Sequence, residues 1–185
     1  ADKISIGSQA VEEAQEFLST GTPPSGSSIR QISLHYGAQA VVVSVDPRRV
    51  YVSGPEETPH HTIRLPDGRY CWYQCTVRGG REARDIDARE LCRTCERLGA
   101  GEILLNSIDA DGTGAGFDLP LISEISQAVS IPVIASSGAG SADHFVEVFR
   151  ATDAEAALAA GIFHRRKVTI QQVKDAMRAA GIPVR

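Results

Sequence analysis

Residues 102–118, EILLNSIDADGTGAGFD, run from an apolar segment into acidic residues and a glycine-rich loop. The segment 103–105 is continuously apolar rather than alternating, which is typical of a parallel strand covered on both faces. Asp109, Asp111 and Gly112 follow it. Ligands of parallel α/β folds bind at the carboxyl ends of the strands, because the loops after the strands converge there. The stretch therefore predicts a parallel sheet with a polar site at this end.

Four other runs of the chain are also strand-like, most of them continuously apolar, and helical patterns alternate with all five. The strand-like runs are residues 1–6 (ADKISI), 39–46 (QAVVVSVD), 131–138 (IPVIASSG) and 155–163 (EAALAAGIF), and the helical patterns span residues 9–21, 27–37, 85–99, 118–129, 141–152 and 169–181. Ser27 or Ser28 is the expected N-cap of the second helix. This alternation predicts βαβ units and an α/β fold. With 185 residues, the chain fits one domain.

The composition argues against two classes of protein. The formal net charge is −4, and basic residues are scattered apart from short groups such as Arg165-Arg166-Lys167, whereas a nucleic-acid binder usually carries a basic stripe. No apolar run approaches the roughly 20 residues of a membrane span, and the first residues lack a signal-peptide pattern. We therefore expect a soluble protein without nucleic-acid or membrane partners, in the cytoplasm, or in a plastid if the source is a plant.

The four cysteines have a spacing that resembles a zinc ribbon, with Cys71 near Cys75 and Cys92 near Cys95. The competing interpretation is packing: DARELCRTCERLGAG places the second pair on the apolar stripe of a helix, and RYCWYQCTV places the first pair on one face of a strand. We favour packing, and expect neither a metal site nor a disulfide, since the compartment is reducing.

Residues 48–82 interrupt the alternation and read as an inserted β-hairpin. Pro66-Asp67-Gly68 is its turn, and Gly79-Gly80 forms a flexible exit. The insertion follows directly after a strand that is expected to end at Asp46. An active-site flap and a surface decoration both remain open as interpretations.

The candidate site consists of polar residues at the expected strand ends. Asp46 and Asp111 end or follow neighbouring strands, and Asn106 lies late in the second of them; for any single acid, a helix cap or a turn residue is the alternative. Small residues after the next two strands let backbone N–H groups close around an anion, and a phosphate site in this place recurs in (βα)8 barrels. These small residues are Ser136, Ser137, Gly138 and Gly161, and Gly7-Ser8 after the first strand forms a weaker second candidate.

These motifs together resemble a known family. ADKISIGS, QAVVVSVDPRRV, GAGEILLNSIDADGTGAGFD, IPVIASSGAGSADHF and AALAAGIFH are similar to the cyclase part of imidazole glycerol phosphate synthase, and the insertion resembles that of the eukaryotic type, in which a glutaminase is fused to the cyclase. The resemblance covers essentially the whole chain. It implies a (βα)8 TIM barrel that uses ammonia from a glutaminase to convert the bis-phosphorylated ribonucleotide PRFAR to imidazole glycerol phosphate and AICAR, without a metal or redox cofactor.

The resemblance also assigns roles to residues. It implies that Asp46 is a principal catalytic aspartate and that Asp111 is a supporting acid. It places Asn106 where some relatives have Thr. It further implies that Gly7 and Ser8 contact one phosphate, and that the other is held by Gly112, Ser136, Ser137, Gly138 and Gly161. Bacterial relatives have Asn-Thr in place of Gly7-Ser8 and Ser in place of Gly161.

Two charged residues stand at the starts of strands, on the face opposite catalysis. In the family, charged residues at the positions of Lys3 and Glu102 gate the entry of ammonia. The alternative is an ion pair that only stabilises this face.

The resemblance places the chain at strands four to eight of the barrel, with the hairpin insertion after strand five. The expected partners are therefore the remaining N-terminal part of the barrel and a glutaminase domain or subunit. Five strands cannot close a barrel, so we expect residues 1–185 to be inactive alone. Two alternatives remain: the paralogous phosphoribosylformimino isomerase of the same pathway, and a non-catalytic phosphate-binding half-barrel.

Overall fold

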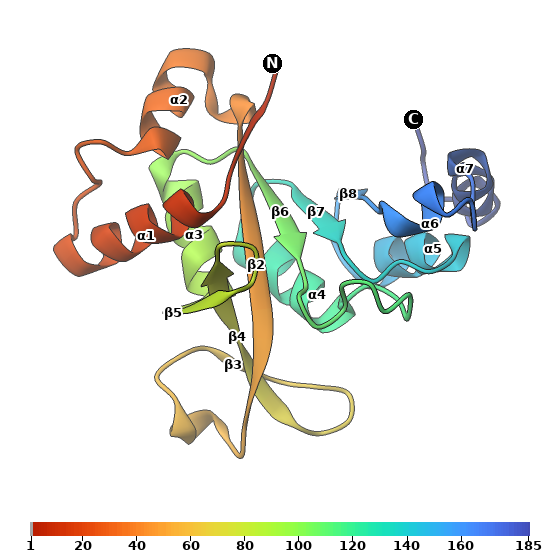
Figure 1. Cartoon of the computed structure of the whole chain (residues 1–185), viewed down its shortest axis with the longest axis horizontal. Helices are drawn as coiled ribbons and strands as arrows, with labels where there is room; N and C mark the ends of the chain where they lie inside the picture. Colours follow the sequence, from red (N-terminus) through yellow and green to blue (C-terminus); the bar gives the residue numbers. More distant parts are fainter. Residues whose placement is uncertain (1) are drawn as a thin grey trace.

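The computed structural model describes residues 2–185 and contains a parallel sheet of five strands. The strands are β1 (Ile4–Ile6), β2 (Val41–Val52), β6 (Glu102–Asn106), β7 (Val133–Ser136) and β8 (Ala156–Ala157). They lie in the order β1-β2-β6-β7-β8, and each neighbouring pair is parallel (Figure 1). The five parallel strands thus lie side by side in the same order in which they follow one another along the chain. The prediction of an α/β fold with a parallel sheet is confirmed.

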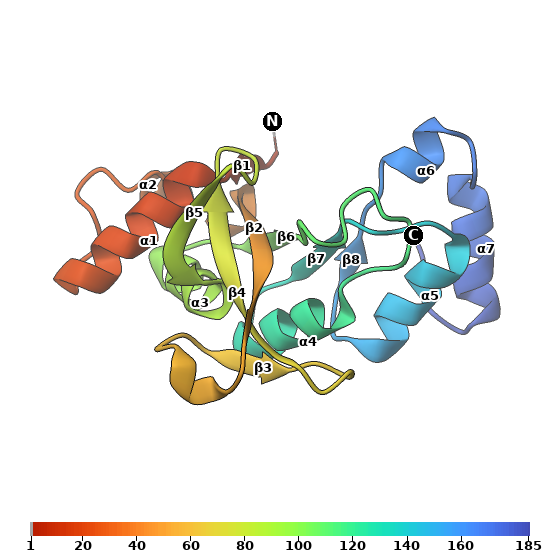
Figure 2. The ribbon, with the colours of Figure 1, turned by 60° about the horizontal axis from the view of Figure 1, so that its bottom comes forward.

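Helices connect the parallel strands. They are α1 (Ser8–Thr20), α2 (Ser28–Tyr36), α3 (Ala88–Leu98), α4 (Leu119–Ala128), α5 (Ala142–Ala151), α6 (Gly161–His164) and α7 (Ile170–Ala179), with 3-10 turns at Ala38–Ala40 and Pro55–Glu57. Successive contacts join α1 to α3, α3 to α4, α4 to α5 and α5 to α7, so the helices form one layer (Figure 2). Ser27 is the N-cap of α2, where its hydroxyl accepts a hydrogen bond from the amide of Arg30. None of the helices described between residues 2 and 185 is long and apolar enough to cross a bilayer.

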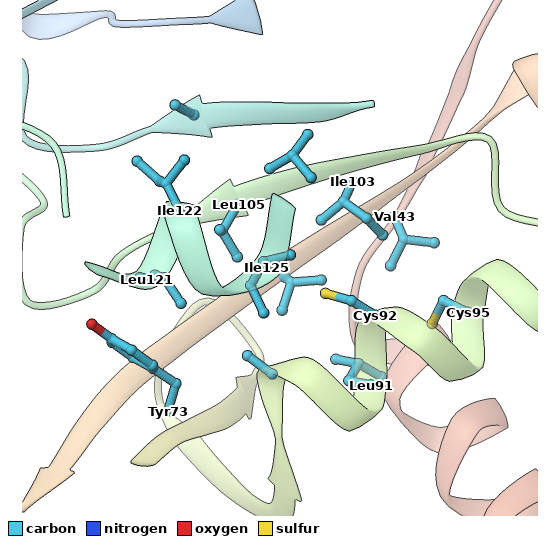
Figure 3. Packing of buried hydrophobic residues seen from close by; sticks show 14 of the residues in the cluster. Val43, Tyr73, Leu91, Cys92, Cys95, Ile103, Leu105, Leu121, Ile122 and Ile125 are labelled. Carbon is cyan, nitrogen blue, oxygen red and sulfur yellow. The ribbon is translucent and has the colours of Figure 1, made fainter. Parts of the chain in front are cut away.

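The core lies between the parallel sheet and the helix layer. Val43, Ile103 and Leu105 project from β2 and β6 toward Leu91 of α3 and Ile125 of α4 (Figure 3). All five side chains are fully buried. Because side chains alternate along a strand, the even-numbered neighbours on β2 and β6 point to the opposite face of the sheet. That opposite face carries the polar residues of the site.

All four cysteines are buried free thiols that pack in this core. Cys92 and Cys95 lie on the buried stripe of α3, and Cys71 and Cys75 on β4. Burial raises the pKa of Cys71 to about 11 and that of Cys95 to about 12, and it raises those of Cys75 and Cys92 well above the ordinary thiol value. The thiols are therefore neutral and act as small apolar side chains.

The insertion is a small antiparallel sheet rather than a simple hairpin. β4 (Tyr70–Val77) pairs with the outer part of β2, with β3 (Thr62–Arg64) and with β5 (Glu82–Asp87). In Figure 1, β2 runs continuously from the parallel sheet into this second sheet. The prediction of a helix from residue 85 is therefore wrong at its start. Residues 85–87 belong to β5, and α3 begins only after Asp87, whose side chain caps it by accepting from the amide of Glu90.

The last strand also differs from the prediction. Residues 155–163 were expected to be a strand that leaves Gly161 at its end, but β8 is two residues long and Gly161 is the first residue of α6. The segment is rich in alanine, which has a low strand propensity, and β8 pairs on one side only within the described residues. Gly161 still follows the carboxyl end of β8.

Candidate functional site

Three polar side chains share the face of the sheet that points away from the core. Asn106 of β6 donates through its amide nitrogen to the carboxylate of Asp46 (2.8 Å) and to the hydroxyl of Ser44 (3.0 Å), both on β2. Ser44 and Asp46 are two residues apart, so they point to the same side of the strand. Asn106 uses both of its amide protons on these partners. This orients the Asp46 carboxylate while leaving its second oxygen for another group.

Asp46 lies at a change of strand pairing. Val45 pairs in parallel with Leu105 of β6, whereas Asp46 pairs antiparallel with Thr76 of β4. The hydroxyl of Thr76 donates to the backbone carbonyl of Asp46 (2.6 Å). The prediction that the strand ends at Asp46 is therefore wrong. Only the parallel pairing ends there, and the strand continues to Val52 because β4 supplies new hydrogen bonds. Asp46 keeps its place at the carboxyl end of the parallel sheet.

A cavity of about 360 Å³ lies among the segments that follow β6, β7 and β8. It brings together six of the residues singled out in the sequence: Asp111, Gly112, Ser136, Ser137, Gly138 and Gly161. The loops after three neighbouring strands thus converge, as their order in the sheet requires. Asp46 is not among the lining residues; it stands on the strand itself, with the Asp111 loop following from the neighbouring β6.

The loops after β6 and β7 are in direct backbone contact. The amide of Gly116 donates to the carbonyl of Gly138 at 2.9 Å. Gly138 has φ +93°, and a Cβ at this position would lie 2.0 Å from the carbonyl oxygen of Gly116. Only glycine allows this approach. The wall of the cavity between Gly112 and Ser137 therefore depends on a close contact of main chains.

A buried polar network holds the two ends of the Asp111 loop together. Asp118, the N-cap of α4, accepts hydrogen bonds from the hydroxyl of Ser107 (3.1 Å), from the guanidinium of Arg49 (2.6 Å) and from the hydroxyl of Tyr73 (3.0 Å). Ser107 begins the loop and Asp118 ends it. Arg49 and Tyr73 belong to the inserted sheet, so the insertion and the loop share this carboxylate.

The network also shifts the pKa values of two of its members. Burial lowers the pKa of Arg49, but the hydrogen bond and the charge of Asp118 outweigh this and raise it above its ordinary value. Burial, together with the charge of Asp118, raises the pKa of Tyr73 well above its ordinary value. Arg49 is therefore charged and Tyr73 neutral throughout the physiological pH range. The Asp118 side chain is 2% exposed, so a neutral partner in place of Arg49 would leave a buried charge without compensation.

Gly7 and Ser8 lie at the carboxyl end of β1 but apart from this cavity. Gly7 is the N-cap of α1 and lies beside Ser44 of β2. The hydroxyl of Ser8 accepts a hydrogen bond from the amide of Arg78 (3.0 Å), in the turn between β4 and β5. The insertion thus covers this second candidate site. The two candidate anion sites are on opposite sides of Asp46 in the strand order.

Lys3 and Glu102 form a salt bridge at the other end of the sheet. Lys3 immediately precedes β1 and Glu102 begins β6, so both stand at the amino ends of strands, as was predicted. The Lys3 side chain is 49% exposed and that of Glu102 18%. The pair is separated from Asp46 and Asn106 by the length of the parallel strands.

Comparison with known proteins agrees with the resemblance found in the sequence. Residues 1–169 match the family described as Histidine biosynthesis protein. The chain belongs to this family. It is 60% identical over 190 residues to the chloroplastic imidazole glycerol phosphate synthase hisHF of Arabidopsis thaliana, and 54% identical over 191 residues to the hisHF protein of Schizosaccharomyces pombe. It is also 45% identical over 186 residues to the HisF subunit of imidazole glycerol phosphate synthase from Methanopyrus kandleri.

These matches cover all of this chain but only part of each relative. The chain spans 32% and 35% of the two hisHF proteins and 64% of the HisF subunit. The histidine biosynthesis family thus matches the chain along its length, whereas each relative named here contains further sequence.

Several residues of the site were not predicted from the sequence. Ser107, Arg49, Tyr73 and Asp118 come from distant parts of the chain, and no local pattern links them. Arg165 and Lys167 line the cavity. Their basic cluster was visible in the sequence, but the turn after α6, rather than the end of a strand, carries it to the site.

Proposed function

We propose that this chain supplies the cyclase site of an imidazole glycerol phosphate synthase, which uses ammonia to convert PRFAR to imidazole glycerol phosphate and AICAR. The observation that carries the proposal is the convergence of Asp111 with the serine and glycine loops around one cavity, next to the strand that holds Asp46. The high identity to hisHF and HisF proteins supports the same assignment. The five parallel strands would be strands four to eight of a (βα)8 barrel, with the antiparallel insertion after strand five.

The proposed chemistry suits oriented carboxylates. Addition of ammonia and ring closure require protons to leave nitrogen and to reach oxygen, and a positioned acid or base typically contributes about 10²–10⁴-fold. The Asp46 carboxylate, held by Asn106 through one oxygen, would accept a proton from the attacking amine with the other. Asp111 would hold hydroxyl groups of the substrate. Gly7 and Ser8 would bind one phosphate, and the loops around Gly112, Ser136, Ser137, Gly138 and Gly161 the other.

Ammonia would enter from the opposite end of the sheet. Lys3 and Glu102 are charged residues at the amino ends of their strands, and we propose that they gate passage from a glutaminase domain or subunit. Within the described residues β1 and β8 each pair on one side only, so this sheet is open. We further propose that additional strands complete the barrel, and that residues 1–185 alone do not turn over the substrate.

The test is ammonia-dependent turnover of PRFAR by the full-length protein. We expect Asp46→Asn to lower kcat by about 10²–10⁴-fold, because Asn cannot accept the proton. The matched control is Asp153→Asn, an exposed carboxylate in the loop before β8, at the far end of the sheet. It should leave kcat unchanged. Wild-type turnover by Asp46→Asn would refute the role of Asp46, and no turnover by the wild-type protein would refute the cyclase assignment.

A further inference from the structure

The cavity after β6, β7 and β8 is lined by two cationic side chains that have no role in the function proposed above. Arg165 and Lys167 follow α6, and both line the cavity together with Asp111 and Ser137. The remaining lining residues carry no positive charge, and Asp111 carries a negative one. Arg165 and Lys167 are therefore the source of net positive charge in this cavity.

The turn after α6 brings both side chains to the cavity and leaves the residue between them outside it. The amide of Arg165 donates to the carbonyl of Gly161 (3.0 Å), and the amide of Lys167 donates to the carbonyl of Ile162 (2.9 Å). Between them, Arg166 adopts φ +52°, the left-handed conformation that a non-glycine residue rarely takes. The reversal folds residue 167 back toward the start of α6. Arg166 does not line the cavity.

The charges of these side chains are not used elsewhere in the described part of the chain. The salt bridges found among residues 2–185 involve neither Arg165 nor Lys167. Both side chains are exposed to solvent. A dianionic phosphate in the cavity would be repelled by the Asp111 carboxylate, and two cations lining the same cavity would more than offset that repulsion.

We propose that Arg165 and Lys167 hold one phosphate group of the substrate through their side chains and thereby determine its affinity. The identity of the substrate in this assignment rests on the proposed function. The class of ligand, a phosphate anion, does not. Backbone amides of the glycine loops orient the phosphate oxygens, and the two cations supply the charge. They bind the phosphate and take no part in proton transfer.

The test uses the full-length protein with Arg165→Gln and Lys167→Gln, and with Arg166→Gln as the matched control. Arg166 has the same charge and lies in the same turn, but outside the cavity. Binding of inorganic phosphate is measured by phosphorus NMR titration, and kcat and KM for PRFAR are measured with saturating ammonium. We expect each of the two site variants to weaken phosphate binding and to raise KM by about 5–50-fold, with kcat within about threefold, because this contact is equally strong in the ground state and the transition state.

Arg166→Gln should leave both readouts within about twofold of the wild-type values. If Arg166→Gln weakened phosphate binding as much as the two site variants do, the positive charge of the whole basic cluster would be responsible rather than these two side chains. That result would overturn the proposal. Unchanged phosphate affinity and KM in the two site variants would overturn it while leaving the cyclase assignment intact. If the wild-type protein does not turn over PRFAR but its phosphate affinity still depends on residues 165 and 167, the cyclase assignment fails and the anion site stands.

Discussion

Gly138 shows how a single backbone position determines the shape of the cavity for which we propose phosphate binding. Its positive φ and the 2.0 Å approach of the Gly116 carbonyl to a hypothetical Cβ are two separate obstacles to any other residue. We expect Gly138→Ala to cost about 2–4 kcal/mol, from left-handed backbone strain together with the forced separation of two loops. Phosphate binding should be lost with it, because Ser137 and Gly112 would move apart.

The control for this prediction is Gly79→Ala. Gly79 also has a positive φ, +67°, but nothing lies within 4 Å of its hypothetical Cβ. It should cost about 1 kcal/mol and leave phosphate binding unchanged. Thermal unfolding and phosphate titration of the full-length variants measure the two effects. Similar losses in both variants would show that backbone strain alone matters and that the close contact of the loops does not.

At the same scale, sequence alone could locate the site residues that follow from the positions of strand ends. Asp111, Ser137 and Gly138 were predicted because residues at the carboxyl ends of parallel strands must converge. Asp118 was not, since its partner Arg49 is 69 residues away and belongs to a different sheet. A contact of this kind depends on the twist and register of an insertion, which local patterns do not encode.

The inserted sheet and the Asp111 loop behave as connected elements because they share Asp118. The substitution Asp118→Asn keeps the shape of the side chain but removes the charge that compensates Arg49. We expect it to destabilise this region by about 2–3 kcal/mol, less than for a fully buried pair because Arg49 is 23% exposed. Amide hydrogen exchange of residues 107–117 should then become about 30–150-fold faster, if these amides exchange through opening of this region.

The comparison variant is Asp109→Asn. Asp109 lies in the same loop and accepts a hydrogen bond from the backbone amide of Arg49 (2.8 Å), but it is exposed to solvent. Asn can still accept that bond, so exchange should change less than about threefold. Exchange mass spectrometry on the full-length protein separates the two. Unchanged protection of the loop in Asp118→Asn would mean that the insertion does not hold the loop in place.

The elements themselves were predictable where one interaction dominates. Apolar runs identified all five parallel strands. Within the described residues their burial is one-sided, however: β6 alternates between buried and half-buried side chains, and in β1 only Ile6 is buried. The ends of β2 and β8 were not predictable, since they depend on pairing: β4 extends β2 to Val52, and β8 lacks a second neighbour within the described residues. Cys92 and Cys95 were assigned to a helix stripe from their spacing, and the neutral buried thiols of α3 agree with that assignment.

On the scale of the whole molecule, the parallel strands separate two polar groups with different proposed roles. Asp46 and the cavity lie at the carboxyl ends, and the Lys3–Glu102 salt bridge lies at the amino ends. A residue that only gates ammonia should matter when ammonia comes from glutamine, and not when ammonium is supplied in solution at saturation. A residue that acts in the chemical step should matter for both sources. Comparing the two nitrogen sources therefore distinguishes the two ends of the sheet.

We expect Lys3→Met to change the glutamine-dependent rate of the full-length protein at least fivefold while the rate with saturating ammonium stays within about twofold. The salt bridge with Glu102 is lost in this variant, so Glu102→Gln in the same background should add little, because the two residues act as one unit. Lys174→Met is the matched control. Lys174 of α7 lines a second, apolar cavity at the amino ends of the strands, and Lys3 and Glu102 line the same cavity. If both rates fall equally in Lys3→Met, the ion pair stabilises this face of the fold and gates nothing.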